Sequence, residues 1–229
     1  MKMNKSNCEK AEMLVEVLPY VNRFRDKIIV IKYGGNAMIN EDLKKAVMQD
    51  LLLMKSVGMH PILVHGGGPA INDMLKKLKV ESHFEQGLRV TDKETMEIVE
   101  MVLAGKVNKD IVGTLNQIGG KGIGLSGKDG NLIQARKKYL EKNGEKIDIG
   151  YVGEVEAVNK EMLESLIYSG YIPVISSIGM GKDGMSYNIN ADYVAGAVAK
   201  AVQANKFILL TDVEGIFRDY HDKDSLLSR

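Results

Sequence analysis

The sequence predicts an α/β fold, a three-layer sandwich with a mainly parallel central sheet. Two apolar and largely β-branched stretches, residues 28–31 and 61–64, have the composition of strands that are buried on both faces. Each stretch runs into a glycine-rich turn and then into a segment whose apolar residues have helical spacing. Strand, turn and helix repeated along a chain are typical of a parallel sheet covered by helices.

Composition is that of an ordinary globular protein. Of 229 residues, 45% are hydrophobic and 27% charged, and the formal net charge of +1 indicates neither nucleic acid nor a membrane surface as a partner. The one cysteine, Cys8, excludes a disulfide framework and indicates a reducing compartment. Residues 1–10 carry no secretory signal, and no apolar run approaches the roughly 20 residues of a membrane span. We therefore expect a cytoplasmic protein.

An amphipathic helix is expected at residues 11–25, ahead of the first core strand. Its apolar stripe consists of Met13, Leu14, Val17, Leu18, Val21 and Phe24. Pro19 lies inside this segment and should kink or divide the helix. The stripe packs either on its own domain or on another subunit, and the pattern alone leaves both open.

The two glycine-rich turns, residues 32–36 and 65–69, are candidates for an anion site. Ligands of open α/β sheets bind beyond the carboxyl ends of the strands. Glycine lets backbone N–H groups approach an anion closely, and Lys32 adds a mobile charge. One such turn alone is more often an ordinary connection, but two together favour a site for a charged group. His65, which precedes three glycines, is expected to be structural rather than catalytic.

Four helices are expected next, over residues 41–58, 70–79, 93–103 and 106–117. Gly58 suits the C-terminal cap of the first, and Thr91 or Asp92 caps the third. Arg89 lies just before that cap, in a loop or hairpin. From spacing alone, Arg89 is either a solvated surface charge or a bidentate clamp on a carboxylate.

Residues 122–129 match two nucleotide-binding patterns, and we reject both. Their glycines have the dinucleotide spacing, and Lys128 is placed as in a phosphate-binding loop. However, Asp129 stands where that loop needs Ser or Thr to hold magnesium, and no helix follows. We expect a core strand at residues 123–125 and then a loop.

The rest of the chain is expected to hold a β-hairpin excursion of short strands at residues 131–158, a helix at 160–169, strands at 171–177 and 207–212, and a helix ending near Ala204. Asn190 or Asp192 would cap that last helix. The strand ends then collect glycine loops, one lysine and one aspartate, without a Ser-His-Asp set or metal-ligand spacing. Such a set suits the transfer of a charged group by positioning and charge neutralisation.

From about residue 12 to its end, the chain resembles the amino acid kinase family. The resemblance rests on residues 31–38, 65–69, 87–91, 187–192 and 210–213. The second and third of these motifs together are similar to the branch that acts on N-acetyl-L-glutamate. The resemblance implies ATP-dependent phosphorylation of the side-chain carboxylate of N-acetyl-L-glutamate, the second step of arginine biosynthesis.

The resemblance also implies roles for individual residues. Catalytic roles fall to Lys32, which neutralises the transferred phosphoryl group, to Gly35, which helps cradle it, and to Asp192, which orients lysine ammonium groups. Substrate binding falls to Gly67, Gly68, Arg89 and Asn188, with Arg89 on the α-carboxylate. The nucleotide would lie along Gly34, Asp212, Val213, Glu214, Gly215, Ile216 and Phe217. Mg²⁺ would bridge the ATP phosphates, so no residue is assigned as a metal ligand.

Three parts of the chain are implied: an oligomerisation helix at residues 1–25, an acetylglutamate-binding lobe at 26–185 and the start of a nucleotide-binding lobe at 186–229. Dimers, or a hexamer inhibited by L-arginine, are implied for the full-length protein. Chains of the family continue into a Gly-Gly-Met-x-x-Lys stretch whose lysine is the second charge on the phosphoryl group. This sequence lacks that stretch, so we expect the chain as given to be truncated and almost inactive.

Two rival functions remain at this point. A sister kinase acting on aspartate, glutamate, carbamate or UMP would share Lys32, Gly34 and Gly35. A non-catalytic amino-acid-binding or assembly module would not need the second lysine that this sequence lacks.

Overall fold

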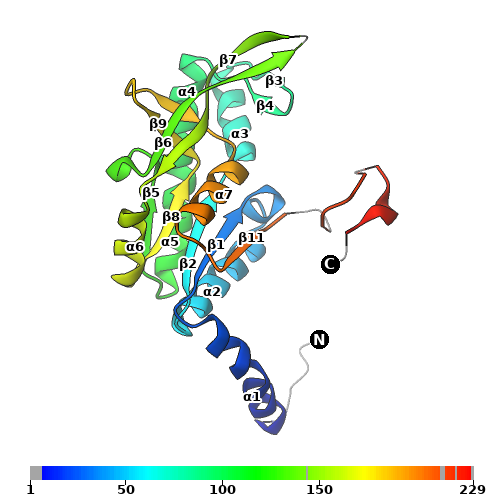
Figure 1. Cartoon of the computed structure of the whole chain (residues 1–229), viewed down its shortest axis with the longest axis vertical. Coiled ribbons are helices and arrows are strands. Elements are labelled where there is room, and N and C mark those ends of the chain that lie inside the picture. The colour runs from blue at the N-terminus through cyan, green and yellow to red at the C-terminus, as the bar shows by residue number, and fades with distance from the viewer. Residues whose placement is uncertain (1–6, 143, 212–214, 220, 228–229) are drawn as a thin grey trace.

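A five-stranded parallel sheet forms the centre of the molecule (Figure 1). The structure is a computed structural model, which describes residues 7–142, 144–211, 215–219 and 221–227. The sheet has the order β11-β1-β2-β8-β5, and every neighbouring pair is parallel. Its strands are β1 (Ile28–Tyr33), β2 (His60–His65), β5 (Gly122–Leu125), β8 (Ile172–Ser176) and β11 (Lys206–Leu209). The predicted α/β fold with a parallel central sheet is confirmed.

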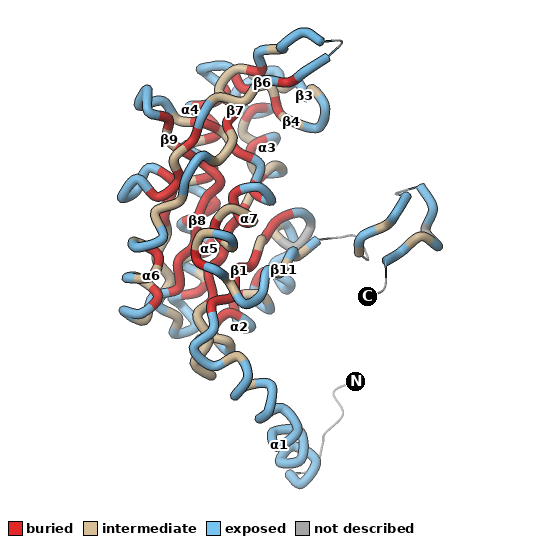
Figure 2. Tube along the Cα trace, in the orientation of Figure 1, coloured by how far each residue is buried: buried red, intermediate tan, exposed pale blue. Residues whose placement is uncertain are grey.

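Two hydrophobic cores lie on opposite faces of this sheet. Ile29, Ile31 and Tyr33 of β1 face the first core, under α2 (Glu41–Ser56) and α3 (Gly68–Leu78). Ile28 and Val30 face the second, under α6 (Lys160–Tyr168) and α7 (Ala191–Ala201). Figure 2 shows the buried residues gathered between these layers. Burial on both faces explains why the strand reads as an unbroken apolar run.

The helix that follows Asp92 differs from the prediction of two separate helices. The chain stays helical through α4 (Lys93–Glu100), a π-helical stretch η2 (Met101–Val107) and α5 (Asn108–Gln117). In the π-helical stretch the Asn108 N–H donates to the carbonyl of Leu103, five residues back. Gly105 does not end the helix, since the cost of glycine inside a helix is only about 1 kcal/mol. Burial of Val102, Leu103 and Val107 against the first core outweighs this cost.

A small closed barrel stands beside the sheet, where only short strands were expected. Its order is β10-β7-β6-β9, from β6 (Ile133–Lys142), β7 (Glu145–Val158), β9 (Ile178–Gly181) and β10 (Ser186–Asn188). The first two strands form the predicted hairpin, but they have 10 and 14 residues. Gly150, expected in a turn, lies within β7 with φ 78° and forms a bridge to Thr91. A short hairpin of β3 (Phe84–Glu85) and β4 (Leu88–Arg89) completes this end.

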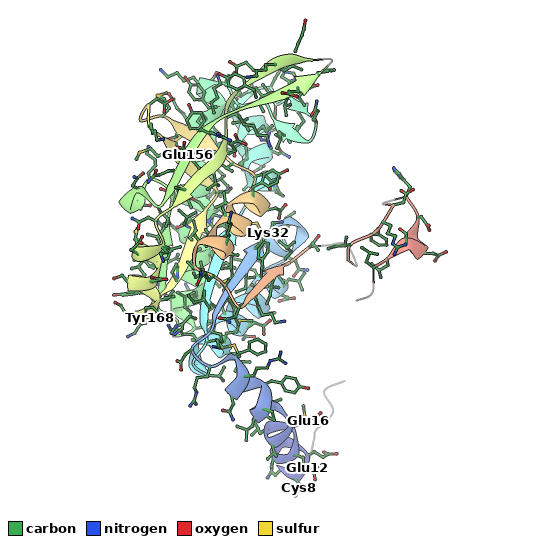
Figure 3. All side chains as sticks on the ribbon, in the orientation of Figure 1. Cys8, Glu12, Glu16, Lys32, Glu156 and Tyr168 are labelled. Carbon is green, nitrogen blue, oxygen red and sulfur yellow. The ribbon has the colours of Figure 1, made fainter. Side chains whose placement is uncertain are left out.

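The N-terminal helix α1 (Asn7–Phe24) projects away from the body (Figures 1 and 2). None of its residues is buried, and Leu14 is 71% exposed. Cys8, Glu12 and Glu16 mark its outer end in Figure 3. Pro19 lies inside one continuous helix, so the helix is not divided. Most of its apolar stripe is therefore exposed, and only Val21 and Phe24, next to the body, are half-buried.

The described C-terminal residues stand apart from the sheet (Figure 1). Phe217 and Leu226 form an isolated bridge, and a short 3₁₀ turn, η4 (Lys223–Ser225), lies between them. Among the described residues, we find no helix with the length and apolar character of a membrane span.

Candidate active site

A cleft of about 300 Å³ opens where the carboxyl ends of β1 and β2 meet the start of α7. We call it the glycine cleft. The predicted site residues that line it are Lys32, Gly34, Gly35, Gly67, Gly68, Arg89, Asn188 and Asp192. These residues come from four separate segments of the chain, and parallel pairing brings the two glycine turns together. The structure therefore places all predicted catalytic and substrate-binding residues around one cavity.

Lys32 and Asp192 form an ion pair at the centre of this cleft. Lys32 Nζ lies 3.1 Å from Asp192 Oδ1, and the lysine side chain is 17% exposed. Figure 3 shows Lys32 on β1, close to α7. Asn190 caps α7, because its side chain accepts from the Asp192 N–H at 2.8 Å. The Asp192 carboxylate is therefore left to hold the lysine ammonium group.

Gly34 provides the space that this ammonium group occupies. A Cβ at Gly34 would lie 3.0 Å from Lys32 Nζ, which is tighter than an ordinary van der Waals contact. Gly35 takes φ 64°, a left-handed conformation that glycine adopts without strain. In the first glycine turn, Gly34 thus leaves room for the Lys32 ammonium group, and Gly35 allows the left-handed backbone that follows.

The second glycine turn leads directly into α3. No side chain caps this helix, so N–H groups of its first turn remain available to an anion. The Gly66 N–H donates to the Tyr33 carbonyl at 3.1 Å, which ties the two glycine turns together. A Cβ at Gly67 would lie 2.5 Å from Leu103 Cδ2, so any larger residue would force the Leu103 side chain of the π-helical stretch to shift. The backbone at Gly67 is therefore held close to a packed surface.

Arg89 enters the cleft from the short β3–β4 hairpin. It is 7% exposed, its guanidinium lies 4.6 Å from the centre of the Phe84 ring, and burial lowers its pKa. Its Nη2 donates to Asn72 Oδ1 at 2.5 Å, and its Nη1 donates to Ser82 Oγ. A guanidinium has five N–H donors and remains charged in proteins. The two bonds leave three donors for a ligand, so the structure favours the clamp over a solvated surface charge.

The sequence prediction missed the residues that hold Arg89. Asn72 falls within the helix expected at residues 70–79 but was given no role, and Ser82 and Phe84 belong to no recognised pattern. Asn72 comes from α3, whereas Ser82 and Phe84 lie two residues apart at the start of the β3–β4 hairpin, and the two segments meet around Arg89 only in the folded chain. Spacing along the sequence therefore gave no signal for them.

Asn188 connects the far wall of the cleft to the hairpin. Its Nδ2 donates to Thr91 Oγ1 at 3.3 Å, and Thr91 Oγ1 donates to the Arg89 carbonyl at 2.8 Å. Thr91 is fully buried, and its backbone pairs with Ile149 and Tyr151 of β7. Asp92, rather than Thr91, caps α4 by accepting from the Thr95 N–H at 2.8 Å. The β6–β7 hairpin is thereby fastened to the wall that carries Arg89.

The residues predicted along the nucleotide fall into three groups. Gly34 lines the glycine cleft. Gly215, Ile216 and Phe217 lie in the C-terminal segment that stands apart from the sheet, so the structure does not bring them to the cleft (Figure 1). Asp212, Val213 and Glu214 lie outside the described residues. Over the described ranges, no three His, Cys, Asp or Glu side chains are grouped to hold a metal ion.

The rejected pattern at residues 122–129 takes no part in the cleft. Lys128 Nζ lies 2.9 Å from Glu100 Oε1, and Asp129 accepts from the Ser126 N–H at 2.6 Å. A strand, β5, precedes this turn and the strand β6 follows it, as expected.

Sequence comparisons place the chain among kinases of small acids. A family model described as the amino acid kinase family matches residues 27–229. The acetylglutamate kinase of Moorella thermoacetica is 58% identical over 230 residues, which cover 99% of this chain and 78% of that relative. The acetylglutamate kinase of Caldicellulosiruptor bescii is 60% identical over 215 residues, with 94% and 73% covered. The chain thus spans about three quarters of the length of these relatives.

Solved structures share the same architecture. A crystal structure from Streptococcus mutans superposes with a TM-score of 0.72 at 36% identity, over 83% of this chain and 75% of that chain. An N-acetylglutamate synthase from Neisseria gonorrhoeae, complexed with coenzyme A and N-acetyl-glutamate, has a TM-score of 0.80 at 23% identity, with 98% and 49% covered. The second likeness concerns the fold alone.

Proposed function

Since this chain belongs to the amino acid kinase family, we propose that it transfers the γ-phosphoryl group of ATP to the side-chain carboxylate of N-acetyl-L-glutamate. The observation that carries the proposal is the glycine cleft, where an ion-paired lysine, two glycine turns and a buried arginine meet. The product would be N-acetyl-L-glutamyl 5-phosphate, in the second step of arginine biosynthesis. The cleft volume of about 300 Å³ suits a small acid.

Arg89 is proposed to hold the α-carboxylate of the substrate through the donors that Asn72 and Ser82 leave free. Asn188, Gly67 and Gly68 line the same cavity and would contact the rest of the acetylated amino acid. A neutral acetamide in place of an ammonium group removes the need for an acidic partner. This arrangement orients the side-chain carboxylate toward Lys32.

The chemical step needs charge neutralisation more than proton transfer. An oxygen of the substrate carboxylate forms the new bond to phosphorus, while the bond from phosphorus to the bridging oxygen of ADP breaks. The carboxylate is already ionised at neutral pH, so no general base is required. Lys32 would face the charge that builds on the transferred group, and Asp192 would hold its ammonium in place. N–H groups near Gly35 and Gly67 would share that charge.

The nucleotide is proposed to reach the cleft past Gly34. Mg²⁺ would be held mainly by the phosphates of ATP, where it shields their negative charge. We also propose a substrate lobe at residues 26–185 and a nucleotide lobe from residue 186, as the family resemblance implies. A cytoplasmic location fits the biosynthetic role and the free, exposed Cys8.

An acceptor panel tests the proposed function. Binding of acetylglutamate, glutamate, aspartate, carbamate and UMP is measured by calorimetry, and ADP release is measured with each acceptor. We expect binding and ADP release with acetylglutamate to exceed those with the other acceptors. Preference for unacetylated glutamate would contradict the substrate assignment.

We also propose that α1 joins subunits into a homo-oligomer, a ring of dimers that L-arginine inhibits. Six large apolar side chains of this helix are 46–71% exposed: Met13, Leu14, Val15, Val17, Leu18 and Tyr20. An apolar groove of about 910 Å³ separates the helix from Leu53, Met54 and Met59. A second copy of the helix is the apolar partner that this face fits.

Removal of residues 1–25 tests the assembly. We expect sedimentation to show a smaller oligomer and the response to L-arginine to change. Glu12→Gln, on the same helix, is the matched control and should leave the assembly intact. Identical sedimentation with and without the segment would show that α1 does not join subunits.

A further inference from the structure

A buried histidine lies directly beneath the glycine cleft and has no part in the proposed chemistry. His65, the last residue of β2, is fully buried, and burial lowers its pKa to about 4. The ring therefore stays neutral at physiological pH. Its Nδ1 lies 2.8 Å from the Gly66 carbonyl oxygen, and its Nε2 lies 3.1 Å from Asn108 Nδ2.

The hydrogen-bond network fixes the tautomer of this ring. Asn108 Nδ2 also donates to the Val174 carbonyl at 2.9 Å, and Lys109 Nζ donates to Asn108 Oδ1 at 3.2 Å. These two contacts set which end of the amide faces the ring. Because the NH₂ group faces Nε2, that nitrogen accepts, and the proton resides on Nδ1. The Nδ1–H then donates to the Gly66 carbonyl.

This hydrogen bond sets the orientation of the peptide between Gly66 and Gly67. In a trans peptide the C=O and the following N–H point in opposite directions. The Gly66 carbonyl turns inward to His65, so the Gly67 N–H turns away from the core and toward the cleft. Within the described residues, no backbone carbonyl accepts a hydrogen bond from the Gly67 N–H. The peptide is thus held in the orientation that offers its N–H to an anion.

The rest of the fold keeps Asn108 in reach of His65. Asn108 is fully buried and follows immediately after the π-helical stretch. A Cβ at Gly124 would lie 1.9 Å from Asn108 Oδ1, so the missing side chain makes room for the amide. The same π-helical stretch presses Leu103 and Val107 against Gly67. The π-helical stretch therefore positions both Asn108, which contacts His65, and the side chains that pack against Gly67.

We propose that His65, held by Asn108, is a positioning residue that fixes the Gly66–Gly67 peptide so that its N–H faces the bound anion. The inference rests on the proposed function, because it assigns that N–H to the substrate or to the transferred group. The role assigned to the ring is to donate a hydrogen bond and not to transfer a proton.

The tautomer is measured on the unaltered protein, without any ligand. Long-range ¹⁵N–¹H correlation spectra of the four histidines distinguish an Nδ1–H ring from an Nε2–H ring. The His65→Asn variant identifies the signal that belongs to His65. We expect a neutral Nδ1–H ring at pH 7, and an Nε2–H ring would overturn the proposal.

Three variants then separate positioning from stability. Asn places its amide nitrogen near the position of Nδ1, so His65→Asn keeps the donor to the Gly66 carbonyl. His65→Leu removes it. His60→Leu is the matched control, since His60 lies at the opposite end of the same strand. Each variant is titrated with acetylglutamate while the Gly67 amide signal and the dissociation constant are followed.

The expected pattern is specific to a positioning role. His65→Leu should weaken acetylglutamate binding at least tenfold and abolish the ligand-induced shift of the Gly67 amide. His65→Asn should bind within about threefold of the unaltered protein, and His60→Leu should lower only thermal stability. If folded His65→Leu binds as tightly as His65→Asn, the proposal is wrong. If the unaltered protein fails to bind acetylglutamate, the proposed function is wrong. The tautomer measurement, which needs no ligand, still tests whether His65 orients the Gly66–Gly67 peptide.

Discussion

Replacing Arg89 by alanine is expected to weaken acetylglutamate binding by more than 100-fold. Two of its five N–H donors are taken by Asn72 and Ser82. In the proposed role, a ligand carboxylate would accept two of the remaining three. A hydrogen bond to a charged group is worth about 1.5–3 kcal/mol. The loss of two such bonds amounts to about 3–6 kcal/mol, and each 1.4 kcal/mol is tenfold in the dissociation constant.

Arg89→Lys refines this test, because lysine keeps the charge but loses the planar fork. Losing one of the two bonds costs about 2 kcal/mol, which corresponds to roughly 30-fold weaker binding. Both variants should leave ATP binding nearly unchanged. The assay is isothermal calorimetry at fixed pH and salt, with each ligand titrated separately.

Arg136→Ala is the matched control for the loss of an arginine. The Arg136 side chain is 67% exposed and pairs with Glu154 at 2.7 Å on the barrel. Its removal should change neither affinity by more than about twofold, since exposed ion pairs contribute little. Equal losses of acetylglutamate and ATP binding in Arg89→Ala would refute the clamp. An Arg89→Lys variant with unaltered affinity would show that the charge alone, and not the fork, binds the carboxylate.

The remaining predictions concern the other parts of the cleft. Gly67→Ala places a Cβ 2.5 Å from Leu103 Cδ2 and should cost about 1–3 kcal/mol, which lowers the melting temperature by about 2–4 °C per kcal/mol. In a double-mutant cycle, Leu103→Ala should recover part of that loss, and strictly additive effects would rule out the contact. Asp192→Asn should slow phosphoryl transfer about tenfold to hundredfold, because the carboxylate that lies 3.1 Å from Lys32 Nζ loses its charge. A changed KM with an unchanged kcat would contradict this prediction. His65 has a folded-state pKa of about 4, so the unfolded chain binds more protons than the folded chain between pH 6.5 and 4. Urea unfolding should therefore show up to about 3 kcal/mol of stability lost as the pH falls through that range. The His65→Asn variant should not show this pH dependence.

The middle of the central sheet was predictable because β1, β2 and β8 are buried on both faces. Ile28–Tyr33 reads as a strand without reference to any other part of the chain. The barrel was not predictable to the same degree, since β9 and β10 are short and close the barrel by pairing with β6 and β7, which lie far away in the sequence. The helix across Gly105 was missed for a related reason. Its continuity depends on tertiary burial, which overrides local propensity.

The candidate site was likewise predictable only in part. Lys32 and the glycine turns follow from the rule that ligands bind at the carboxyl ends of parallel strands. Arg89 and Asp192 each had a plausible alternative from spacing alone, as a surface charge and as a helix cap. The structure brings both to the glycine cleft and gives the cap to Asn190. Their proposed roles remain predictions that the binding and rate measurements above address.

The pairing of β1 with β11 has a consequence for biosynthesis of the chain. Lys32 lies opposite Leu209 in the register of these two strands. During translation, the strand that carries the lysine therefore waits until residues 206–209 have been synthesised before it can pair with this neighbour. Parallel pairs with such large sequence separation raise the contact order and slow folding. Until β11 is in place, this edge of Ile28–Tyr33 presents unpaired backbone groups beside apolar side chains, a combination that favours aggregation.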